Sequence, residues 1–445
     1  MKIRLSPDAL VHLQRLCPEK SAQRRHTPGW RRVFYAWLVL AQPTHLNRRG
    51  WYLALLGTFA LHGLYFATWV SRTPEIQANL QLSTAEYGLF SMVAGLGSLI
   101  AIIFSGRIIG AFGSRRVLLV SYIALSALVI FAGLSITTGS LIATIAISFG
   151  IGICTSFGGF ANNIEGTSVD RASQRSLLPS LHGAFSAGML LGSAIGAATL
   201  AANLPLMINF LAIACVVLAG AIWATRYIPR DGGLHITPDM NTAEIRTLVT
   251  SAERRQVWRE PRTLVVALIG LSFVLGEATA ATWLPIILVD SGLTQAEAAF
   301  AFTCFAIAMT VGRLAGGFAV ERLSKPVLVT IIALTAAAGI ILVMLTSVTH
   351  LPYVGAILWG LGCSLGFPLA ASALSESPRL ATARLRVLLV FSNIAGLSTG
   401  PVLGFIGQIS NLFIALSVPV LFFLGSAASS RSTKPLSPAV GGTNQ

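Results

Sequence analysis

The stretch that decides the fold covers residues 83–116 and reads STAEYGLFSMVAGLGSLIAIIFSGRIIGAFGSRR. It opens with Ser83 and Glu86, three residues apart, a spacing typical of the capping box that starts a helix. The apolar run that follows is long enough to cross a bilayer, and it ends in a segment rich in glycine and arginine, residues 106–116. The stretch therefore predicts one membrane-spanning helix with a marked start and a marked end.

The same plan returns later in the chain. Thr294 and Glu297 form a second capping-box pattern, and the apolar run after them ends in residues 317–325. The start signals and the end signals of the two copies are equally far apart, since 294 minus 83 and 317 minus 106 both give 211. A spacing that is kept from start to end indicates an internal repeat. The chain is therefore predicted to be two copies of one membrane-embedded half.

The composition is that of a membrane protein. Of 445 residues, 54% are hydrophobic and 11% are charged, whereas a soluble domain has about 25% charged residues. The apolar runs should be helices, because lipid offers no partner for open backbone groups. We predict an all-α membrane protein with twelve transmembrane helices in two six-helix, pseudo-symmetric bundles. The predicted spans are residues 51–71, 86–106, 116–136, 140–165, 179–201, 204–226, 263–288, 295–317, 326–347, 351–374, 386–408 and 411–428.

The net charge of +15 follows from the predicted topology. When the N-terminus is placed in the cytoplasm, every one of the 31 lysines and arginines except Arg72 falls toward the cytoplasmic side. This positive-inside bias predicts that both termini are cytoplasmic, in a bacterial inner membrane. Because topology accounts for the charge, no nucleic-acid partner is predicted.

The spans and the polar stretches between them predict five segments. Residues 1–50 are a basic cytoplasmic extension, 51–226 the first six-helix bundle, and 227–262 a cytoplasmic linker. Residues 263–428 are the second bundle, and residues 429–445 are a Ser-, Pro- and Gly-rich tail that we expect to be disordered.

Motifs for covalent chemistry and for cofactors are not found in the sequence. It has no Gly-x-x-x-x-Gly-Lys-Ser/Thr for ATP hydrolysis. The few histidines have no metal-ligand spacing, and the five cysteines form no Cys-x-x-Cys. We therefore predict a protein that is not an enzyme, holds no metal or cofactor, and is driven by a gradient.

The segment from Gly106 to Arg116, together with the duplicated layout, resembles the major facilitator superfamily. Its signature between the second and third helices is Gly-x-x-x-Asp-Arg-x-Gly-Arg-Arg. Gly106, Gly113 and Arg115 match, and Arg107 and Arg116 add basic charge, but Gly110 occupies the acidic position. In the family that acid helps hold the two halves together on the cytoplasmic side, so this contact is in doubt for the first half.

The second copy of the signature keeps Gly317, Glu321 and Arg322. Further segments resemble a bacterial branch of the superfamily near the fucose-permease type. The resemblance implies transport of a small solute by alternating access, commonly coupled to protons. Drug exporters of the family carry Gly-Pro-x-x-Gly in the fifth span, whereas here Gly400-Pro401 lies in the eleventh, which weighs against export. The branch segments are residues 69–76, 162–166 and 181–186.

Two titratable residues fall near the middle of repeat-related spans. Glu277 lies mid-way along the seventh span, where an ionised carboxylate costs about 2.5–3.5 kcal/mol. The shift of 214 that relates Trp69 to Trp283 places His62 of the first span beside it. Because repeat-built transporters bind solute at the midplane, we predict that Glu277 is the proton-coupling carboxylate and that His62 assists. Structural hydrogen bonding between helices is the alternative for both.

The fourth and tenth spans carry polar residues near their cytoplasmic ends. Asn162 and Asn163 have amides that can bind a solute. Glu165 and Glu376 are separated by 211 positions, so both halves place an acid there, which favours a cytoplasmic gate. The expected basic partners are Arg171 or Arg175 for the first acid and Arg379 or Arg384 for the second.

The remaining candidates lie at span ends. His182 and Asn393 either line the solute path or pack. Trp69 and Trp283 belong either to the aromatic belt at the membrane interface, which we favour, or to a platform for a sugar ring. Arg313, like Arg107, should extend its side chain to the inner face.

We predict a monomeric secondary transporter of a small polar solute, of sugar or organic acid type, coupled to protons. One alternative is a proton-linked exporter of amphipathic compounds, which Phe157, Phe160 and Phe367 would suit. The other is a membrane receptor that signals through residues 227–262. The predicted partners are the solute, protons and the lipid bilayer.

Overall fold

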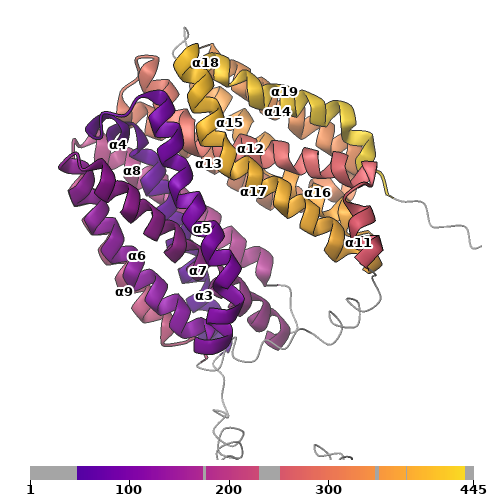
Figure 1. The fold of residues 1–445 in the computed structure, drawn as a ribbon, viewed down its shortest axis with the longest axis horizontal. Coiled ribbons are helices and arrows are strands. Elements are labelled where there is room, and N and C mark those ends of the chain that lie inside the picture. Colours follow the sequence, from indigo (N-terminus) through magenta and orange to yellow (C-terminus); the bar gives the residue numbers. More distant parts are fainter. Residues whose placement is uncertain (1–47, 174–176, 230–250, 346–349, 377, 436–445) are drawn as a thin grey trace, which may run out of the picture. The chain divides into compact units, whose positions relative to one another are not determined.

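The computed structural model describes residues 48–173, 177–229, 251–345, 350–376 and 378–435. In this part of the chain all regular structure is helical (Figure 1). Twelve helical segments are long and apolar enough to cross a membrane, which confirms the predicted fold class. Residues 1–47 and 436–445, and with them most of the predicted basic extension and of the tail, lie outside the described residues.

The first six spans are continuous helices, and one short helix follows the first of them. In this half α3 packs on α8, and α6 packs on both α7 and α9. The helices are α3 (Arg48–Ser71), α4 (Thr73–Asn79), α5 (Thr84–Phe112), α6 (Ser114–Thr137), α7 (Leu141–Ser173), α8 (Leu178–Ala201) and α9 (Leu206–Thr225).

The second six spans follow a short linker helix and include two broken spans. Here α12 packs on α17, and α14 packs on α15 and α19. The helices are α11 (Ser251–Val257), α12 (Pro261–Asp290), α13 (Gln295–Arg322), α14 (Lys325–Met344), α15 (Leu351–Cys363), α16 (Gly366–Leu374), α17 (Pro378–Ile409), α18 (Leu412–Ala415), α19 (Ser417–Ser429) and the 3-10 helix η1 (Ser430–Thr433).

Both predicted capping boxes are confirmed. The backbone N–H of Ser83 donates to Glu86 Oε2 at 2.8 Å, and the N–H of Glu86 donates back to Ser83 Oγ at 3.4 Å. Thr294 and Glu297 make the same reciprocal pair at 2.8 and 3.3 Å. The start of the repeated helix is therefore built identically in both halves, from side chains three residues apart.

The predicted span 86–106 ends too early, because most of the signature segment is helical. Helix α5 continues through Gly106, Arg107 and Gly110 to Phe112. It ends because Gly113 takes a φ of +79°, a value that favours glycine, and α6 begins at the next residue. The change from apolar to basic residues therefore marks the edge of the bilayer and not the end of the helix.

The start of the predicted disordered tail is ordered. Residues 430–433 form η1, and Arg262 on α12 donates through Nε to the carbonyl of Ser432 at 3.1 Å and through Nη2 to that of Lys434 at 2.8 Å. These contacts hold the chain beyond α19 against the second bundle. The prediction of disorder from residue 429 was therefore wrong for residues 430–434.

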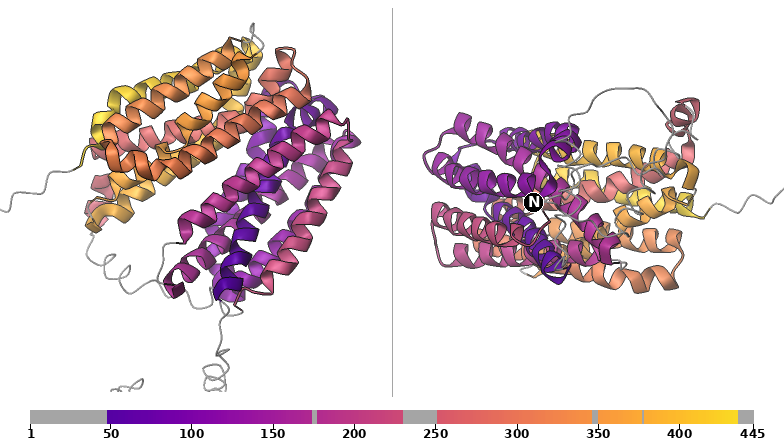
Figure 2. Two further views of the ribbon diagram at one scale, coloured as in Figure 1. Left: turned by 180° about the vertical axis from the view of Figure 1, so that it is seen from behind. Right: turned by 90° about the horizontal axis from the view of Figure 1, so that it is seen from below.

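We name the two ends of the bundles by their residues. The basic end is where α5 gives way to α6 and α13 to α14, and it carries Arg115, Arg116, Arg322 and Lys325. The opposite end is where α5 and α13 begin. Figures 1 and 2 show the purple and orange bundles meeting toward the opposite end and diverging toward the basic end.

The bundles meet at the opposite end through backbone contact between α5 and α17. A Cβ added to Gly88 would lie 2.4 Å from the carbonyl oxygen of Gly400 and 3.2 Å from the Cα of Gly404. Beside this contact Tyr87 sets its ring edge-on to Trp283 on α12, with centroids 5.6 Å apart. Only residues without a side chain let two helix backbones approach so closely.

At the basic end a buried carboxylate ties the first bundle together. Glu165 on α7 is fully buried, and its Oε2 accepts from the indole N–H of Trp51 on α3 at 2.9 Å. Its Oε1 accepts from the hydroxyl of Ser114, the first residue of α6. The carboxylate therefore lies at a helix N-terminus, where the helix dipole favours negative charge.

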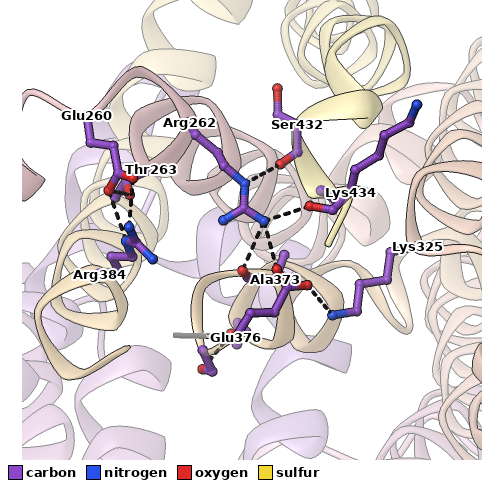
Figure 3. A network of polar contacts seen from close by, with 12 residues as sticks. Glu260, Arg262, Thr263, Lys325, Ala373, Glu376, Arg384, Ser432 and Lys434 are labelled. Carbon is purple, nitrogen blue, oxygen red and sulfur yellow. Dashed lines mark hydrogen bonds and ion pairs between the residues drawn. The ribbon is translucent and has the colours of Figure 1, made fainter. Parts of the chain in front are cut away.

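The second bundle repeats this arrangement with different chemistry (Figure 3). Glu376 accepts from Arg262 Nη2 at 3.0 Å and from Lys325 Nζ at 2.8 Å. Each of the three residues is 211 positions after its counterpart, because 262 minus 51, 325 minus 114 and 376 minus 165 give that number. The repeat therefore keeps the geometry of the carboxylate site and replaces two neutral donors by two cations.

Of the four arginines predicted as partners of the two acids, the described residues test only Arg384, and for it the prediction was wrong. Arg384 does not pair with Glu376 but forms a fork on Glu260, with Nε 2.9 Å and Nη2 2.7 Å from the two oxygens (Figure 3). Arg175 and the side chains of Arg171 and Arg379 lie outside the described part of the chain. The donors of Glu165 and Glu376 named above come from their own bundle, because each site sits where helix ends of one bundle converge.

Substituting Gly88 by Ala should push α5 and α17 apart at the opposite end. The added methyl meets backbone, which cannot move aside as a side chain can, and overpacking costs about 1–3 kcal/mol. We expect a cysteine placed at Gln408 to react about fivefold or more faster with an impermeant maleimide. Gly425→Ala is the matched control, because nothing lies within 4 Å of the added carbon. Equal labelling in the two variants would contradict the glycine contact.

Ser114→Ala should destabilise the protein more than its repeat counterpart, Lys325→Ala. The first leaves a fully buried Glu165 oxygen without a donor, which costs about 1–3 kcal/mol. The second leaves Glu376 partly exposed and still bound to Arg262, so the loss should be about 0–1 kcal/mol. The measurement is the apparent unfolding temperature in detergent, and a larger drop for Lys325→Ala would show that charge outweighs burial here.

Glu260 should contribute stability that depends on pH. Burial raises the pKa of Glu260, but hydrogen bonds from Thr263 and Arg384 and the charges of Arg384 and Arg262 offset this, so the pKa lies below its usual value. A carboxyl with a lowered pKa stabilises the fold above its unfolded pKa and loses this effect as pH falls through the folded pKa.

We therefore expect Glu260→Gln to lose about 1 kcal/mol near neutral pH. The difference from the wild type should shrink and disappear as the pH falls toward about 3. Unfolding temperatures measured as a function of pH test this, with Glu321→Gln, an exposed acid, as the control. A difference between wild type and Glu260→Gln that stays constant with pH would be inconsistent with this ion pair.

Candidate functional site

The centre of the candidate site is an ion pair between neighbouring helices. Glu277 lies near the middle of α12, and Arg313 lies nine residues before the end of α13. One guanidinium nitrogen, Nη2, is 3.3 Å from each carboxylate oxygen. The prediction that Arg313 extends to the inner face was wrong, because about 14 Å of helix separates it from Arg322 and a carboxylate lies within reach.

Arg313 also contacts the other bundle. Its Nη1 donates to Ser186 Oγ on α8 at 3.4 Å. Ser186 in turn donates to the carbonyl of His182, one turn earlier, and the imidazole of His182 lies within electrostatic reach of Arg313. The side chains of Arg313 and Glu277 are 32% and 37% exposed, so the pair is open to the space between the bundles.

A cavity of about 310 Å³ lies on the opposite-end side of this pair. Its walls come from α3, α4, α5 and α7 of the first bundle and from α12 of the second. Ala281, one turn beyond Glu277 on the same face of α12, is part of the wall, and so is His62. The volume is at the lower end of the range for small-molecule pockets. Other polar groups in the wall are Trp69, Thr73, Tyr87, Ser91, Ser98, Ser148, Thr155 and Thr282.

His62 lies at the cavity but not against Glu277. Its ring packs on Phe185, with centroids 5.8 Å apart, and its Cε1 is 3.6 Å from where a Cβ of Gly159 would lie. Within the described residues no hydrogen bond joins His62 to Glu277. The role of His62 in proton coupling therefore remains a prediction, and His62 would have to act on Glu277 across the cavity.

The two asparagines of α7 have different surroundings. Asn162 is buried and belongs to a closed set of hydrogen bonds: Thr58 Oγ1 donates to its Oδ1 at 2.8 Å, and its Nδ2 donates to Tyr122 at 3.2 Å. This arrangement favours a packing role. Asn163 is exposed, and its amide donates to the carbonyl of Gly159, on the helix face that looks toward His62.

The remaining polar candidates are exposed on helices of both bundles. Asn393 on α17 resembles Asn163, since its amide donates to the carbonyl of Leu389 at 2.8 Å. His182 is exposed and sets its ring edge-on to Phe59, with centroids 5.4 Å apart. Asn163, His182 and Asn393 keep polar atoms free for a solute, which fits their predicted role without testing it.

The aromatic belt is the wrong description of the two tryptophans. Trp283 is completely buried, and its indole N–H donates to the carbonyl of Thr399 at 3.4 Å. Trp69 is half-buried, stacks on Phe210 with centroids 5.5 Å apart, and lines the cavity. Only Trp69 therefore retains a position from which it can stack on a solute.

The signature residues lie on the last turns of α5 and α13 and at the start of α6. Nothing lies within 4 Å of a Cβ added at Gly106, Gly110 or Gly317, so the acid that the family pattern has at Gly110 would find open space. Arg322 is placed over the ring of Phe318, 3.6 Å from its centroid. The other members are Arg107, Arg116 and Glu321, which are exposed, and Arg115, which is half-buried.

Sequence reasoning missed Arg313 as the partner of Glu277, and Ser186 as a partner of Arg313. Arg313 falls inside the predicted span 295–317, and a cation within a span was itself the signal that could have identified it. Ser186 offered no signal, because serines are common in membrane helices. In the described residues no group of three His, Cys, Asp or Glu side chains could hold a metal ion.

Two curated relatives are similar over most of the chain. An uncharacterized transporter, y4wD, of Sinorhizobium fredii is 29% identical over 315 residues, covering 71% of this chain and 79% of that protein. An uncharacterized MFS-type transporter of Yersinia pestis is 26% identical over 384 residues, covering 84% of this chain and 93% of its own.

Solved transporter structures share the fold at low identity. A D-xylose-proton symporter matches with a TM-score of 0.65 and 12% identity, over 86% of this chain and 96% of the other. The transporter FucP in its outward conformation matches with a TM-score of 0.59 and 16% identity, over 86% and 99%.

The family match covers most of the chain. The sequence model of the Major Facilitator Superfamily matches residues 54–401, from α3 into α17. That family consists of transporters and not of enzymes. The chain is therefore a multi-pass membrane protein that belongs to the major facilitator superfamily.

Proposed function

We propose that this transporter couples the movement of a small polar solute to protons, with Glu277 as the proton-binding carboxylate. The observation that carries the proposal is the ion pair between Glu277 and Arg313, placed deep in the membrane and open to the space between the bundles. One fold relative is a D-xylose-proton symporter, which is consistent with this class of solute and with protons.

The geometry links proton binding to the contact between the bundles. An ionised Glu277 holds Arg313, and Arg313 also reaches Ser186 on α8. A proton on the carboxylate removes the negative charge that positions the guanidinium. Because ligands act by binding two states unequally, a proton that releases Arg313 changes the relative stability of states with different α8–α13 contacts.

The arrangement of the bundles supports alternating access. The close contact of Gly88 with Gly400 lies at the opposite end, and Figure 1 shows the bundles apart toward the basic end. We assign the basic end to the cytoplasm of a bacterial cell on the positive-inside rule, with both chain termini on that side. This state would then be open toward the cytoplasm, and His62 and Trp69 would line the closed part of the solute path. We propose a monomer as the working unit.

The aromatic wall of the cavity supports a second candidate, a proton-linked exporter of amphipathic compounds. Tyr65, Phe66, Trp69 and Phe90 all line it. The phenylalanines that were expected to suit this function are not among the residues that line this cavity; they are Phe157, Phe160 and Phe367. Signalling through residues 227–262 stays a prediction, because residues 230–250 lie outside the described part of the chain.

Glu277→Gln should abolish coupling but leave exchange. Wild-type protein in liposomes should accumulate one of several labelled probes (glucose, xylose, lactate and gluconate) when an inward proton gradient is imposed. Glu277→Gln should bring the probe only to its equilibrium distribution, because the amide binds no proton, while counterflow of the same probe continues.

The control for this measurement is Asp290→Asn, an exposed acid at the end of the same helix. It should accumulate the probe as the wild type does. Gradient-driven accumulation by Glu277→Gln equal to that of the wild type would refute Glu277 as the proton site.

A further inference from the structure

The guanidinium of Arg313 is loosely held. Arginine has five N–H donors, and here a single nitrogen approaches both oxygens of Glu277 at 3.3 Å. The contact to Ser186 is longer still, at 3.4 Å. Charge-assisted hydrogen bonds are usually about 2.7–2.9 Å long. Arg313 therefore has donors, and room around them, for a further acceptor.

Other arginines of the protein show what a structural ion pair looks like here. Two nitrogens of Arg384 donate hydrogen bonds to Glu260, at 2.7 and 2.9 Å. Arg72 is buried and contacts Glu75 at 2.6 Å. Among the ion pairs of the described residues, the pair of Arg313 with Glu277 is the longest and the most exposed. The length and the exposure of this ion pair favour exchange of partners over a rigid contact.

We infer that the solute is an organic anion, and that Arg313 binds its carboxylate in place of Glu277. This inference rests on the proposed proton coupling at Glu277. Protonation of Glu277 leaves Arg313 as a single cation deep in the membrane, which is costly. A carboxylate of the solute restores a planar, two-oxygen partner that matches the guanidinium. A neutral sugar cannot balance this charge.

The charge balance leads to a defined stoichiometry. In the empty site the charges of the Glu277 carboxylate and the Arg313 guanidinium sum to zero. In the loaded site a protonated Glu277, the guanidinium and one solute carboxylate also sum to zero. Both forms can therefore move between the two sides without carrying net charge, and a monocarboxylate should cross together with one proton, electroneutrally.

The ionisable groups around Glu277 are few. Helices α16 and α19, which pack on α12, contain no ionisable residue. On α17 the described arginines, Arg384 and Arg386, lie in its first third, and on α4 Glu75 pairs with Arg72. The groups near Glu277 are Arg313 from α13 and Cys363 from α15. His182 from α8 lies within electrostatic reach of Arg313, and His62 from α3 lies further away, at the cavity.

Matched acids and sugars test the anion site by binding. Purified protein is heated with glucuronate, gluconate or lactate, and separately with glucose and glycerol, at about pH 5.5 and about pH 7.5. At least one acid should raise the unfolding temperature, more at the lower pH, and the neutral compounds should not. Arg313→Gln should raise the dissociation constant of that acid by about tenfold or more.

The controls separate a binding role from a structural one. Arg226→Gln, an exposed cation at the end of α9, should bind the acid as the wild type does. Glu277→Gln should bind it equally well at both pH values, because Arg313 is already released. Stabilisation by neutral compounds that survives in Arg313→Gln, or no shift with any acid, would overturn the anion site.

Flux measurements then separate this inference from the proposed function. Uptake of the bound acid into liposomes should follow an imposed pH gradient and should not change when valinomycin and potassium set a membrane potential. Proton-driven uptake of a neutral probe would overturn the anion inference and leave proton coupling intact. Uptake of the acid that ignores the pH gradient would instead overturn the proposed coupling. Uptake that responds to the potential would overturn the one-to-one stoichiometry.

Discussion

A hydrocarbon core offers no hydrogen-bond partner, and this constraint explains the polar contacts described above. Asn162 closes a set of bonds with Thr58 and Tyr122, and Glu165 uses both oxygens on neighbouring helices. The same demand explains why Arg313 turns to Glu277 and does not extend along the helix toward water. A charged pair costs less than two separate charges there. The midplane can therefore hold a cation and an acid only if they stay within reach of each other.

The repeat keeps positions and changes chemistry. At the basic end Trp51, Ser114 and Glu165 become Arg262, Lys325 and Glu376 at the same spacing, so the helix ends converge in the same way in both halves. At the midplane the two halves differ outright, since Glu277 and Arg313 belong to the second bundle and His62 to the first. The symmetric positions hold each bundle together. The asymmetric positions are the ones at which a proton and a solute can act.

Local patterns in the sequence were sufficient to predict the span count, the repeat and both capping boxes. These features depend on residues a few positions apart, or on a spacing that is kept. The ends of α5 and α13 were placed too early, because the apolar run ends at the bilayer surface whereas the helices continue to Phe112 and Arg322. Glu277 was predictable, because an acid in a span is costly. The close contact of α17 with α5 at Gly88 was not predictable, because it depends on residues of α17 more than 300 positions away.

The contacts of the predicted site residues were also not predictable from the sequence. Trp283 resembles an interfacial tryptophan in sequence, yet Tyr87 of the other bundle and the carbonyl of Thr399 enclose it. Arg313 resembles a residue that reaches water, yet Glu277 on the adjacent helix holds it. In both cases the decisive neighbour is on another helix. A single sequence shows which residues are costly but not which residues meet.

Two kinds of contact join the bundles, and they differ in how they can respond to a ligand. The closest approach of α5 to α17 is between backbone atoms at Gly88 and Gly400, which a proton does not alter. The contact of α13 with α8 runs through Arg313 and Ser186, and its geometry depends on the charge of Glu277. In the proposed mechanism the first contact is the pivot of the two bundles, and the second weakens or strengthens with occupancy of the site. A transporter needs both, because a site that senses its ligand changes access only if another contact stays in place while the bundles rock.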